Sequence, residues 1–184
     1  AGGGGPDGPG PLALQAFWPG VAGIDLMGED VEVPPGVRLC GTEALAALRV
    51  EAGVPAMGRE LGERTIPAEA GLVEGSVSFT KGCYTGQELV ARLDARGSRV
   101  PRRLRGVMVT LEALGDRPAP GPGAELVGGE RVVGELTTVA LSPGLEAVVA
   151  LAYVRREVEP PAGVELRWGA HAVDAQVREL PLVG

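Results

Sequence analysis

The chain has 184 residues, of which 45% are hydrophobic and 22% charged, and its net charge at pH 7 is −7. These values are ordinary for a globular protein of one domain or two small domains. The acidic balance argues against a general nucleic-acid binder, which is usually basic, and no apolar run reaches the roughly 18 residues of a membrane-spanning helix. Because aromatic residues make up only 3% of the sequence, the core must consist mainly of Leu, Val and Ala.

Residues 1–16 are rich in Gly and Pro, so we expect them to form a disordered tail that buries little apolar surface. The tail has neither the basic nor the apolar region of a signal peptide, and the missing initiator Met indicates a processed or truncated chain. The two cysteines, Cys40 and Cys83, form no disulfide framework or metal-binding motif. Without an export signal, we expect a reducing, cytoplasmic location.

Residues 17–98 predict an α+β region. The apolar stretch 17–27 predicts a strand with irregular ends. Thr42 is a suitable N-cap for a helix that runs to Ala52, and Gly53 is a suitable C-terminal stop.

Leu45, Leu48 and Ala52 have the spacing of an apolar stripe on this helix, and Arg49 falls on the same stripe. An arginine in this position either extends its charged end to solvent at the rim of the core or presents its guanidinium to a buried anion. The spacing favours the rim, and both alternatives remain open.

Residues 53–75 predict a loop, because Gly and Pro interrupt the segment repeatedly. Residues 77–79 predict a short strand. A second helix is expected over residues 86–95, ended by Gly97.

Residues 99–184 predict a small antiparallel barrel or sandwich, since short Val- and Leu-rich runs are separated by turn residues. Gly128 and Gly129 predict a two-residue hairpin turn, and the boundary with the preceding region is expected near residues 98–103. The expected strands are 104–111, 125–127, 131–141, 147–154, 164–168 and 172–178.

The most distinctive segment is the octapeptide, residues 81–88 (KGCYTGQE), which contains the only lysine of the chain. All other Lys or Arg positions hold arginine, which suggests that Lys81 was kept because a site needs an ammonium group. Chance survival of one lysine is the alternative.

Thr85 and Glu88 have the spacing of a capping box, which places Cys83 just before a helix N-terminus. The partial positive charge of the helix end and the nearby Lys81 favour a reactive thiolate. Gly86 allows a tight turn and a close approach of a ligand to the backbone. The alternative is a well-formed turn with an inert, half-buried cysteine.

A cluster of arginines with only Asp94 as an opposing charge forms a local anion-attracting patch, or else a solvated helix end and linker. His171, the only histidine, is interpreted as structural. The arginine cluster consists of Arg92, Arg96, Arg99, Arg102, Arg103 and Arg105.

The octapeptide resembles the signature of the YgfZ-type folate-binding proteins, which are relatives of the glycine-cleavage aminomethyltransferase, the T-protein. Residues 48–53 (LRVEAG) resemble the LRxEAG helix of that family, and residues 65–69 (TIPAE) resemble its TIPxE loop. The similarity runs from about residue 17 to near the C-terminus. It implies the C-terminal portion of a three-domain fold around a tetrahydrofolate channel, ending in a small β-barrel.

The resemblance implies a tetrahydrofolate-binding accessory protein for the assembly or repair of iron–sulfur enzymes, with a link to tRNA modification. Lys81 and Cys83 would be the reactive residues. Arg49 would hold the glutamate tail of folate and Glu69 its pterin. The remaining expected ligand-binding residues are Tyr84, Gln87, Glu88 and Arg92.

One departure from the family is serious, because its N-terminal region, which carries much of the folate cavity, is not found before residue 17. Either the chain is a fragment or the protein works differently. Two other functions remain open: transfer of an aminomethyl-derived one-carbon unit to tetrahydrofolate, and binding of RNA or an acidic protein by the arginine cluster. The expected partners are therefore folate, iron–sulfur client proteins or their assembly machinery, and tRNA, with no membrane.

Overall fold

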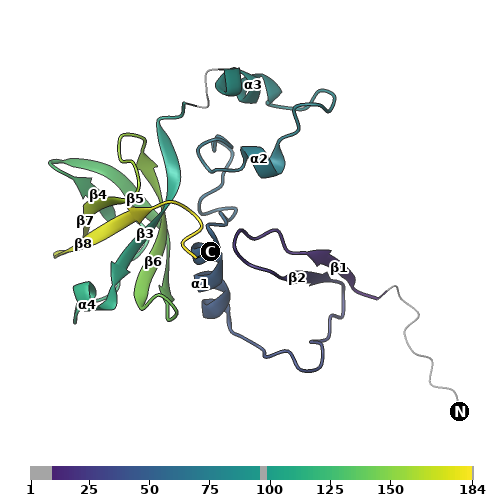
Figure 1. Cartoon of the computed structure of the whole chain (residues 1–184), viewed down its shortest axis with the longest axis horizontal. Coiled ribbons are helices and arrows are strands. Elements are labelled where there is room, and N and C mark those ends of the chain that lie inside the picture. The colour runs from purple at the N-terminus through teal and green to yellow at the C-terminus, as the bar shows by residue number, and fades with distance from the viewer. Residues whose placement is uncertain (1–9, 96–98, 184) are drawn as a thin grey trace, which may run out of the picture.

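The computed structural model describes residues 10–95 and 99–183. The C-terminal half forms a barrel, and the N-terminal half runs as a series of short elements along one side of it (Figure 1). The expected choice between a sandwich and a barrel is thereby settled in favour of the barrel.

The barrel is a closed antiparallel sheet with the strand order β3-β6-β5-β4-β7-β8. Its strands begin and end within two residues of the ranges predicted from the sequence. Closure leaves no unpaired sheet edge. The strands are β3 (Arg102–Thr110), β4 (Glu125–Gly128), β5 (Arg131–Ser142), β6 (Ala147–Arg155), β7 (Ala162–Trp168) and β8 (His171–Arg178).

Two local details of the barrel differ from the prediction. The residues between β4 and β5 are Gly129 and Glu130, so Gly128 is the last strand residue and the predicted turn is shifted by one position. Gly129 has φ +63°, which glycine tolerates better than other residues. A short helix, α4 (Leu111–Leu114), follows β3 and was not predicted.

Strand β6 is buried on both faces, whereas β8 alternates between buried and exposed residues. The inward side chains of β6, such as Val148 and Ala150, join the barrel core. Its outward side chains, such as Val149 and Leu151, pack against Val50 of the helix α1 (Thr42–Ala52). The second buried face of β6 therefore exists because α1 covers the barrel there.

Helix α1 has the predicted range, but its N-cap and its buried face differ from the prediction. The N-cap is Gly41 rather than Thr42, and no side chain caps the helix start. The buried residues are Ala47, Val50 and Ala52, while Leu45 is 55% exposed. The predicted stripe was therefore wrong at Leu45, which faces solvent, whereas its member Ala52 is buried and Leu48 is half-buried.

The C-terminal segment after β8 packs against the end of α1. The backbone N–H of Leu182 donates to the Glu51 carbonyl oxygen at 2.7 Å. Gly53 ends α1 in the left-handed region at φ +74°, as predicted, and a Cβ there would lie 2.7 Å from Cβ of Leu180. The segment that contains Leu180 and Leu182 therefore packs directly against the C-terminal end of α1.

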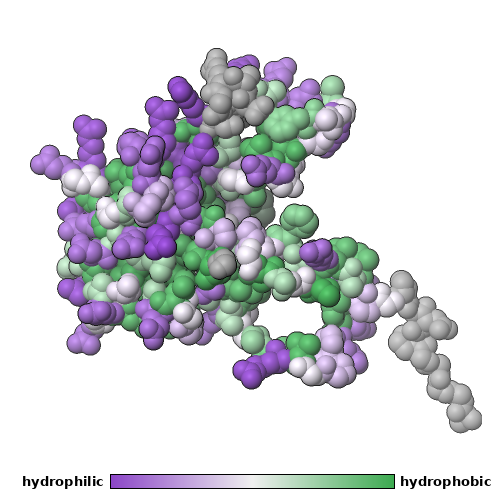
Figure 2. Space-filling view, in the orientation of Figure 1, coloured by the Kyte–Doolittle hydropathy of each residue, from purple (hydrophilic) through white to green (hydrophobic). Residues whose placement is uncertain are grey.

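The N-terminal segment contains a β-hairpin formed by β1 (Leu12–Gln15) and β2 (Ile24–Met27). This corrects two predictions, the tail to residue 16 and the single strand over residues 17–27. Pro19 and Gly20 turn the chain in the middle of the apolar run, so its end pairs with residues assigned to the tail. Figure 2 shows apolar side chains at the surface of this part of the molecule, interspersed with hydrophilic ones.

In the sequence, two short helices separate α1 from the first barrel strand β3, namely α2 (Val73–Ser76) and α3 (Gln87–Ala95). The strand predicted at residues 77–79 is absent, because this stretch has no strand partner among the residues described. The predicted helix stop, Gly97, lies outside the described residues. None of the helices in the described ranges is long and apolar enough to cross a membrane.

Candidate functional site

The carboxylate of Glu60, in the loop after α1, is buried and has hydrogen-bond partners on both of its oxygens. Its Oε2 accepts from the backbone N–H of Ala56 at 2.9 Å and from Arg49 Nη1 at 3.0 Å. Its Oε1 lies 2.7 Å from the Thr137 hydroxyl and 2.5 Å from the Thr138 hydroxyl. The side chain has no solvent exposure, so Glu60 ties the loop to both α1 and β5.

An irregularity in β5 explains how two consecutive threonines reach the same carboxylate oxygen. In a regular strand, adjacent side chains point to opposite faces. The pairing of β5 with β6 shifts its register between Leu136 and Thr138, which breaks this alternation. Both hydroxyls can then face Glu60.

Burial by itself raises the pKa of Glu60, but the hydrogen bonds from Thr138, Ala56 and Thr137, together with the charge of Arg49, lower it below its ordinary value of 4.5. The net direction is downward, so the carboxylate stays ionised. Glu60 is therefore a permanent negative charge that binds Arg49, Thr137 and Thr138.

Arg49 presents its guanidinium to this buried anion, which is the alternative that the helix spacing favoured less. Nη1 also donates to the Val54 carbonyl oxygen at 2.7 Å, and Nη2 donates to the Thr138 hydroxyl at 2.9 Å. The side chain is 15% exposed. Arg49 is thus held by three partners from the protein itself.

Glu69 is the second buried carboxylate of the region. Its Oε2 accepts from Arg102 Nε at 3.0 Å, and its backbone carbonyl accepts from the Leu104 N–H at 2.7 Å. The Arg102 guanidinium also lies 4.6 Å from the centre of the Tyr153 ring. These contacts join the loop at residues 65–69 to strands β3 and β6.

Tyr153 contacts both parts of the region, because its hydroxyl donates to the backbone carbonyl oxygen of Glu60 at 2.9 Å and its ring lies beneath the Arg102 guanidinium that pairs with Glu69. Burial raises the pKa of the Tyr153 phenol, the charge of Arg102 lowers it, and the charges of Glu69 and Glu60 raise it further. The net shift is upward, so the phenol remains a hydrogen-bond donor.

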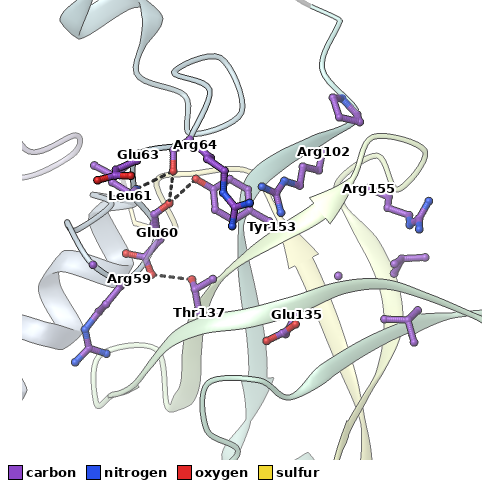
Figure 3. A pocket seen from close by; sticks show the side chains of 17 residues that line it. Arg59, Glu60, Leu61, Glu63, Arg64, Arg102, Glu135, Thr137, Tyr153 and Arg155 are labelled. Carbon is purple, nitrogen blue, oxygen red and sulfur yellow. Dashed lines mark hydrogen bonds between the residues drawn. The ribbon is translucent and has the colours of Figure 1, made fainter.

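A groove of about 1070 Å³ opens beside Tyr153, between the loop over residues 58–65 and strands β3, β5 and β6 (Figure 3). Four arginines line it: Arg59, Arg64, Arg102 and Arg155. Neither Arg64 nor Arg155 has an ion-pair partner in the part of the chain that the structure describes.

The octapeptide forms a separate, shallow pocket of about 570 Å³ at the start of α3. The Lys81 ammonium lies 4.9 Å from the centre of the Tyr84 ring. The Gln87 side chain accepts from the Tyr84 N–H at 3.1 Å and donates to Cys83 Sγ at 3.9 Å. The pocket residues are Cys83, Tyr84, Gly86, Gln87, Glu88 and Arg92.

The capping box predicted from Thr85 and Glu88 was wrong in its residues. Helix α3 begins at Gln87, and Glu88 is exposed in its first turn. The side chain of Gln87 bonds the Tyr84 N–H, while the Gln87 N–H donates to the Tyr84 carbonyl at 3.3 Å. The reciprocal pair lies one position earlier than predicted because Gly86, at φ +87°, turns the chain directly before the helix.

The structure does not bring all the predicted site residues together. Lys81 and Cys83 lie beside α3, together with Tyr84, Gln87, Glu88 and Arg92. Arg49 and Glu69 lie against the barrel, at contacts with β5 and β3. Figure 1 shows α3 standing away from α1 and the barrel.

The arginine cluster is not a single free patch. Arg102 is paired with Glu69, and Arg105 is paired with Glu179 at 2.5 Å. Arg96 lies outside the described residues. His171 packs its ring 5.6 Å from that of Trp168, as a structural side chain would.

Comparison with known proteins assigns the barrel to a class. Residues 102–183 match the family described as "Glycine cleavage T-protein C-terminal barrel domain". The chain is 38% identical over 143 residues to an aminomethyltransferase of Streptomyces avermitilis, a match that covers 75% of this chain. It is 35% identical over 149 residues to an aminomethyltransferase of Rubrobacter xylanophilus, covering 81% of this chain. These matches support the glycine cleavage T-protein superfamily.

A solved structure, the glycine cleavage system aminomethyltransferase T from Bartonella henselae, has the same fold over 76% of this chain, with a TM-score of 0.62 and 23% identity. The chain spans 37% of the Streptomyces avermitilis protein and 38% of the Bartonella henselae chain. The fold expected from the sequence, the C-terminal portion of an aminomethyltransferase-like protein ending in a barrel, is therefore confirmed.

Sequence reasoning did not single out Glu60, Thr137, Thr138 or Tyr153. Two adjacent threonines between apolar residues of β5 were the available signal, because they break the expected alternation. Glu60 gave no local signal, since Thr137 and Thr138 lie 77 and 78 positions away in the sequence.

Proposed function

We propose that this chain binds tetrahydrofolate as part of a protein of the glycine cleavage T-protein superfamily. The observation that carries the proposal is the similarity to aminomethyltransferases over three quarters of the chain. This share exceeds the barrel domain alone, so the similarity includes part of the segment before the barrel.

Glu69 is the residue that we propose for the pterin. Its Oε2 accepts from Arg102, and we assign Oε1 as the acceptor for the amide and amino edge of a pterin. Its fixed position beside Arg102 limits the reorganisation needed on binding. Arg49 is a weaker proposal for the glutamate tail, because Glu60, Thr138 and Val54 already hold its guanidinium.

The first candidate activity is one-carbon transfer, in which the carbon of a carrier-bound aminomethyl group passes to tetrahydrofolate as the methylene group, its nitrogen leaves as ammonia, and the bond to the carrier breaks so that the carrier atom regains a proton. The names of the relatives favour it. A direct test supplies the carrier-bound aminomethyl group and tetrahydrofolate to the chain. We expect methylene-tetrahydrofolate to form if this activity holds, and no product would remove it.

The second candidate is a YgfZ-type accessory role for iron–sulfur enzymes, and the octapeptide is the specific observation that favours it. Lys81 and Cys83 are exposed beside the shallow pocket at α3, where both can meet a client protein. Iron–sulfur client proteins, tRNA and a cytoplasmic location belong to this candidate. A chain that binds folate but forms no methylene-tetrahydrofolate, and that restores iron–sulfur enzyme activity in deficient cells, would support it.

Isothermal titration calorimetry with tetrahydrofolate tests the step that both candidates share. We expect binding by the full chain and weaker binding by Glu69→Gln, because a neutral amide accepts hydrogen bonds less strongly than a carboxylate. Glu63→Gln is the matched control, since Glu63 is exposed. No heat and no thermal shift at millimolar tetrahydrofolate would contradict the proposed function.

A further inference from the structure

The N-terminal hairpin is an exposed apolar arm, which we define as residues 12–27. In the described part of the chain, β1 and β2 pair only with each other, so each strand has one unpaired edge. A two-stranded hairpin is at best marginally stable in water, and monomers rarely expose apolar patches above roughly 300–600 Å². The arm therefore has the properties of an interaction surface. Its exposed large apolar side chains are Leu12, Leu14, Phe17, Ile24 and Met27.

One face of the arm is apolar along both strands. Leu12 lies directly opposite Met27 in the antiparallel pair. Leu14 shares their face, because alternate residues of a strand point to the same side. Asp25, opposite Leu14, is the charged residue of this face. The face can therefore pack against another apolar surface if Asp25 lies at the edge of the contact.

The arm is held in position at its turn. A Cβ added to Gly20 would lie 2.7 Å from the Val183 carbonyl oxygen, so the turn packs against the C-terminal segment. Figure 1 shows the strands of the arm standing apart from the barrel and joined to α1 by the long loop over residues 28–41. Because the hairpin is already formed, it loses less conformational entropy on binding than a flexible tail would.

A second apolar surface, which we call the apolar groove, lies between helix α1 and strand β5 and has a volume of about 950 Å³. Leu45 and Leu141 line it from the two elements, and both side chains are more than half exposed. Val139 adds a third large apolar side chain. The charged residues of the groove are Glu43 and Glu51, which disfavour an anionic ligand.

We propose that the apolar arm of one copy of the chain binds in the apolar groove of a second copy, and that the exchange is reciprocal. Both complementary surfaces are present on one chain, so a second copy supplies a partner for each. A two-fold axis that passes between the arm and the groove forms both contacts at once and closes the assembly as a dimer. The surface involved is separate from the folate-binding residues proposed above.

The area available is sufficient for a stable dimer. Besides the five side chains of the arm, the exposed apolar side chains of Leu45, Leu141 and Leu39, which adjoins the groove residue Cys40, would be covered. Burial of one such side chain removes roughly 60–120 Å² from water, so each copy would bury about 500–1000 Å² of apolar surface. Stable protein interfaces bury about 800 Å² per partner.

Sedimentation velocity over a wide range of protein concentration tests the proposal. We expect a monomer–dimer equilibrium that shifts toward the dimer as salt is added, because each copy carries a net charge of −7 and salt screens their repulsion. A chain that stays monomeric at every concentration, or a dimer that salt dissociates, would overturn the proposal.

Two double variants separate the arm from the groove. The arm variant Leu12→Glu/Leu14→Glu and the groove variant Leu45→Glu/Leu141→Glu should each raise the dissociation constant of the dimer by at least about tenfold, because they bring charges into an apolar contact. Circular dichroism should show that the barrel remains folded, since all four positions are exposed.

The matched control is Phe79→Glu/Leu111→Glu, which adds the same charge at exposed apolar positions outside the arm and the groove and should keep the dimer. If the control dissociates the dimer as strongly as the other two variants, net charge rather than the proposed contact governs association, and the proposal is wrong.

Mixing the arm variant with the groove variant tests reciprocity. Their heterodimer has one intact contact, between the unmodified arm of one chain and the unmodified groove of the other. We therefore expect the mixture to dimerise more strongly than either variant alone. A groove variant that dimerises like the wild type would show that the arms pair with each other, and a mixture no stronger than its components would exclude the reciprocal exchange.

Discussion

The guanidinium of Arg49 lies 3.0 Å from the completely buried carboxylate of Glu60, and this pair joins α1 to the loop that forms one wall of the groove. Thr138 bonds both members, since its hydroxyl donates to Glu60 and accepts from Arg49. The three side chains form a closed network in which each charged group has a partner. Networks of this kind depend on every member.

Removal of Arg49 should therefore be strongly destabilising. Arg49→Ala leaves the Glu60 charge buried without its cation, and we expect a loss of about 3 kcal/mol in the free energy of unfolding. Arg49→Lys should recover only part of the loss, because one ammonium cannot serve the same three acceptors. Urea unfolding followed by circular dichroism measures both values.

Arg59→Ala is the control for this prediction, since Arg59 is exposed and lies next to Glu60 in the sequence. It should change the unfolding free energy by less than about 0.5 kcal/mol. If Arg49→Ala were as mild as Arg59→Ala while tetrahydrofolate binding disappeared, Arg49 would be a ligand-binding residue rather than a structural one.

The lowered pKa of Glu60 predicts how stability depends on pH. The group has an ordinary value of 4.5 in the unfolded chain and a lower value in the folded protein, so the unfolded state binds the proton first as the pH falls. The stabilisation from Glu60 is complete above the unfolded value and is lost as the pH falls through the folded value. Urea unfolding between about pH 7 and pH 3 should show a steeper loss for the wild type than for Glu60→Gln. Parallel pH profiles would show that Glu60 titrates alike in both states.

The barrel was predictable from the sequence because its strands are short, rich in Val and Leu, and separated by turn residues. Alternation along β8 matches its alternating burial. The N-terminal hairpin was not predictable in the same way. Its first strand, β1, directly follows a Gly- and Pro-rich stretch, and the composition of that stretch led to the prediction of a disordered tail. Local composition says little about pairing with a distant segment.

The site was only partly predictable for a related reason. The octapeptide was found because its residues are contiguous in the sequence. In the structure, five of its residues and Arg92 line one pocket at α3. The Glu60 network depends on contacts between α1, a loop and β5, which no local pattern encodes. The position of Arg49 on its helix suggested a buried anion as one alternative, but could not identify which carboxylate.

The end of α1 gives a further prediction about stability. Gly53→Ala places a Cβ 2.7 Å from Leu180 Cβ and adds a left-handed backbone cost, so we expect a loss of about 2–4 kcal/mol. Gly36→Ala is the matched control, because Gly36 also has a positive φ of +84° but has nothing within 4 Å of the added Cβ. It should cost about 1–2 kcal/mol. Equal losses in thermal or urea unfolding would show that the C-terminal segment does not press on the helix stop.

The last prediction concerns the two cysteines, which are both exposed and therefore both accessible to a small reagent. Cys83 Sγ accepts from the Gln87 side-chain amide at 3.9 Å, whereas Cys40 Sγ donates to the Arg38 carbonyl oxygen at 3.9 Å. The two sulfurs therefore differ in their hydrogen-bond partners, an amide donor for Cys83 and a carbonyl acceptor for Cys40. Iodoacetamide should therefore label Cys83 faster than Cys40 near neutral pH, as peptide mass spectrometry can measure, and Gln87→Ala should reduce the difference.

Substitution of Cys83 tests whether its thiol takes part in chemistry or only contributes to packing. Because Cys83 is exposed, Cys83→Ala should leave the melting temperature within a few degrees of the wild type. If the accessory role holds, the variant should fail to restore iron–sulfur enzyme activity in deficient cells, whereas Cys40→Ala should restore it. Equal labelling of the two cysteines would remove the argument for a reactive sulfur. Full complementation by Cys83→Ala would show that the octapeptide acts through its shape and through Lys81 rather than through its thiol.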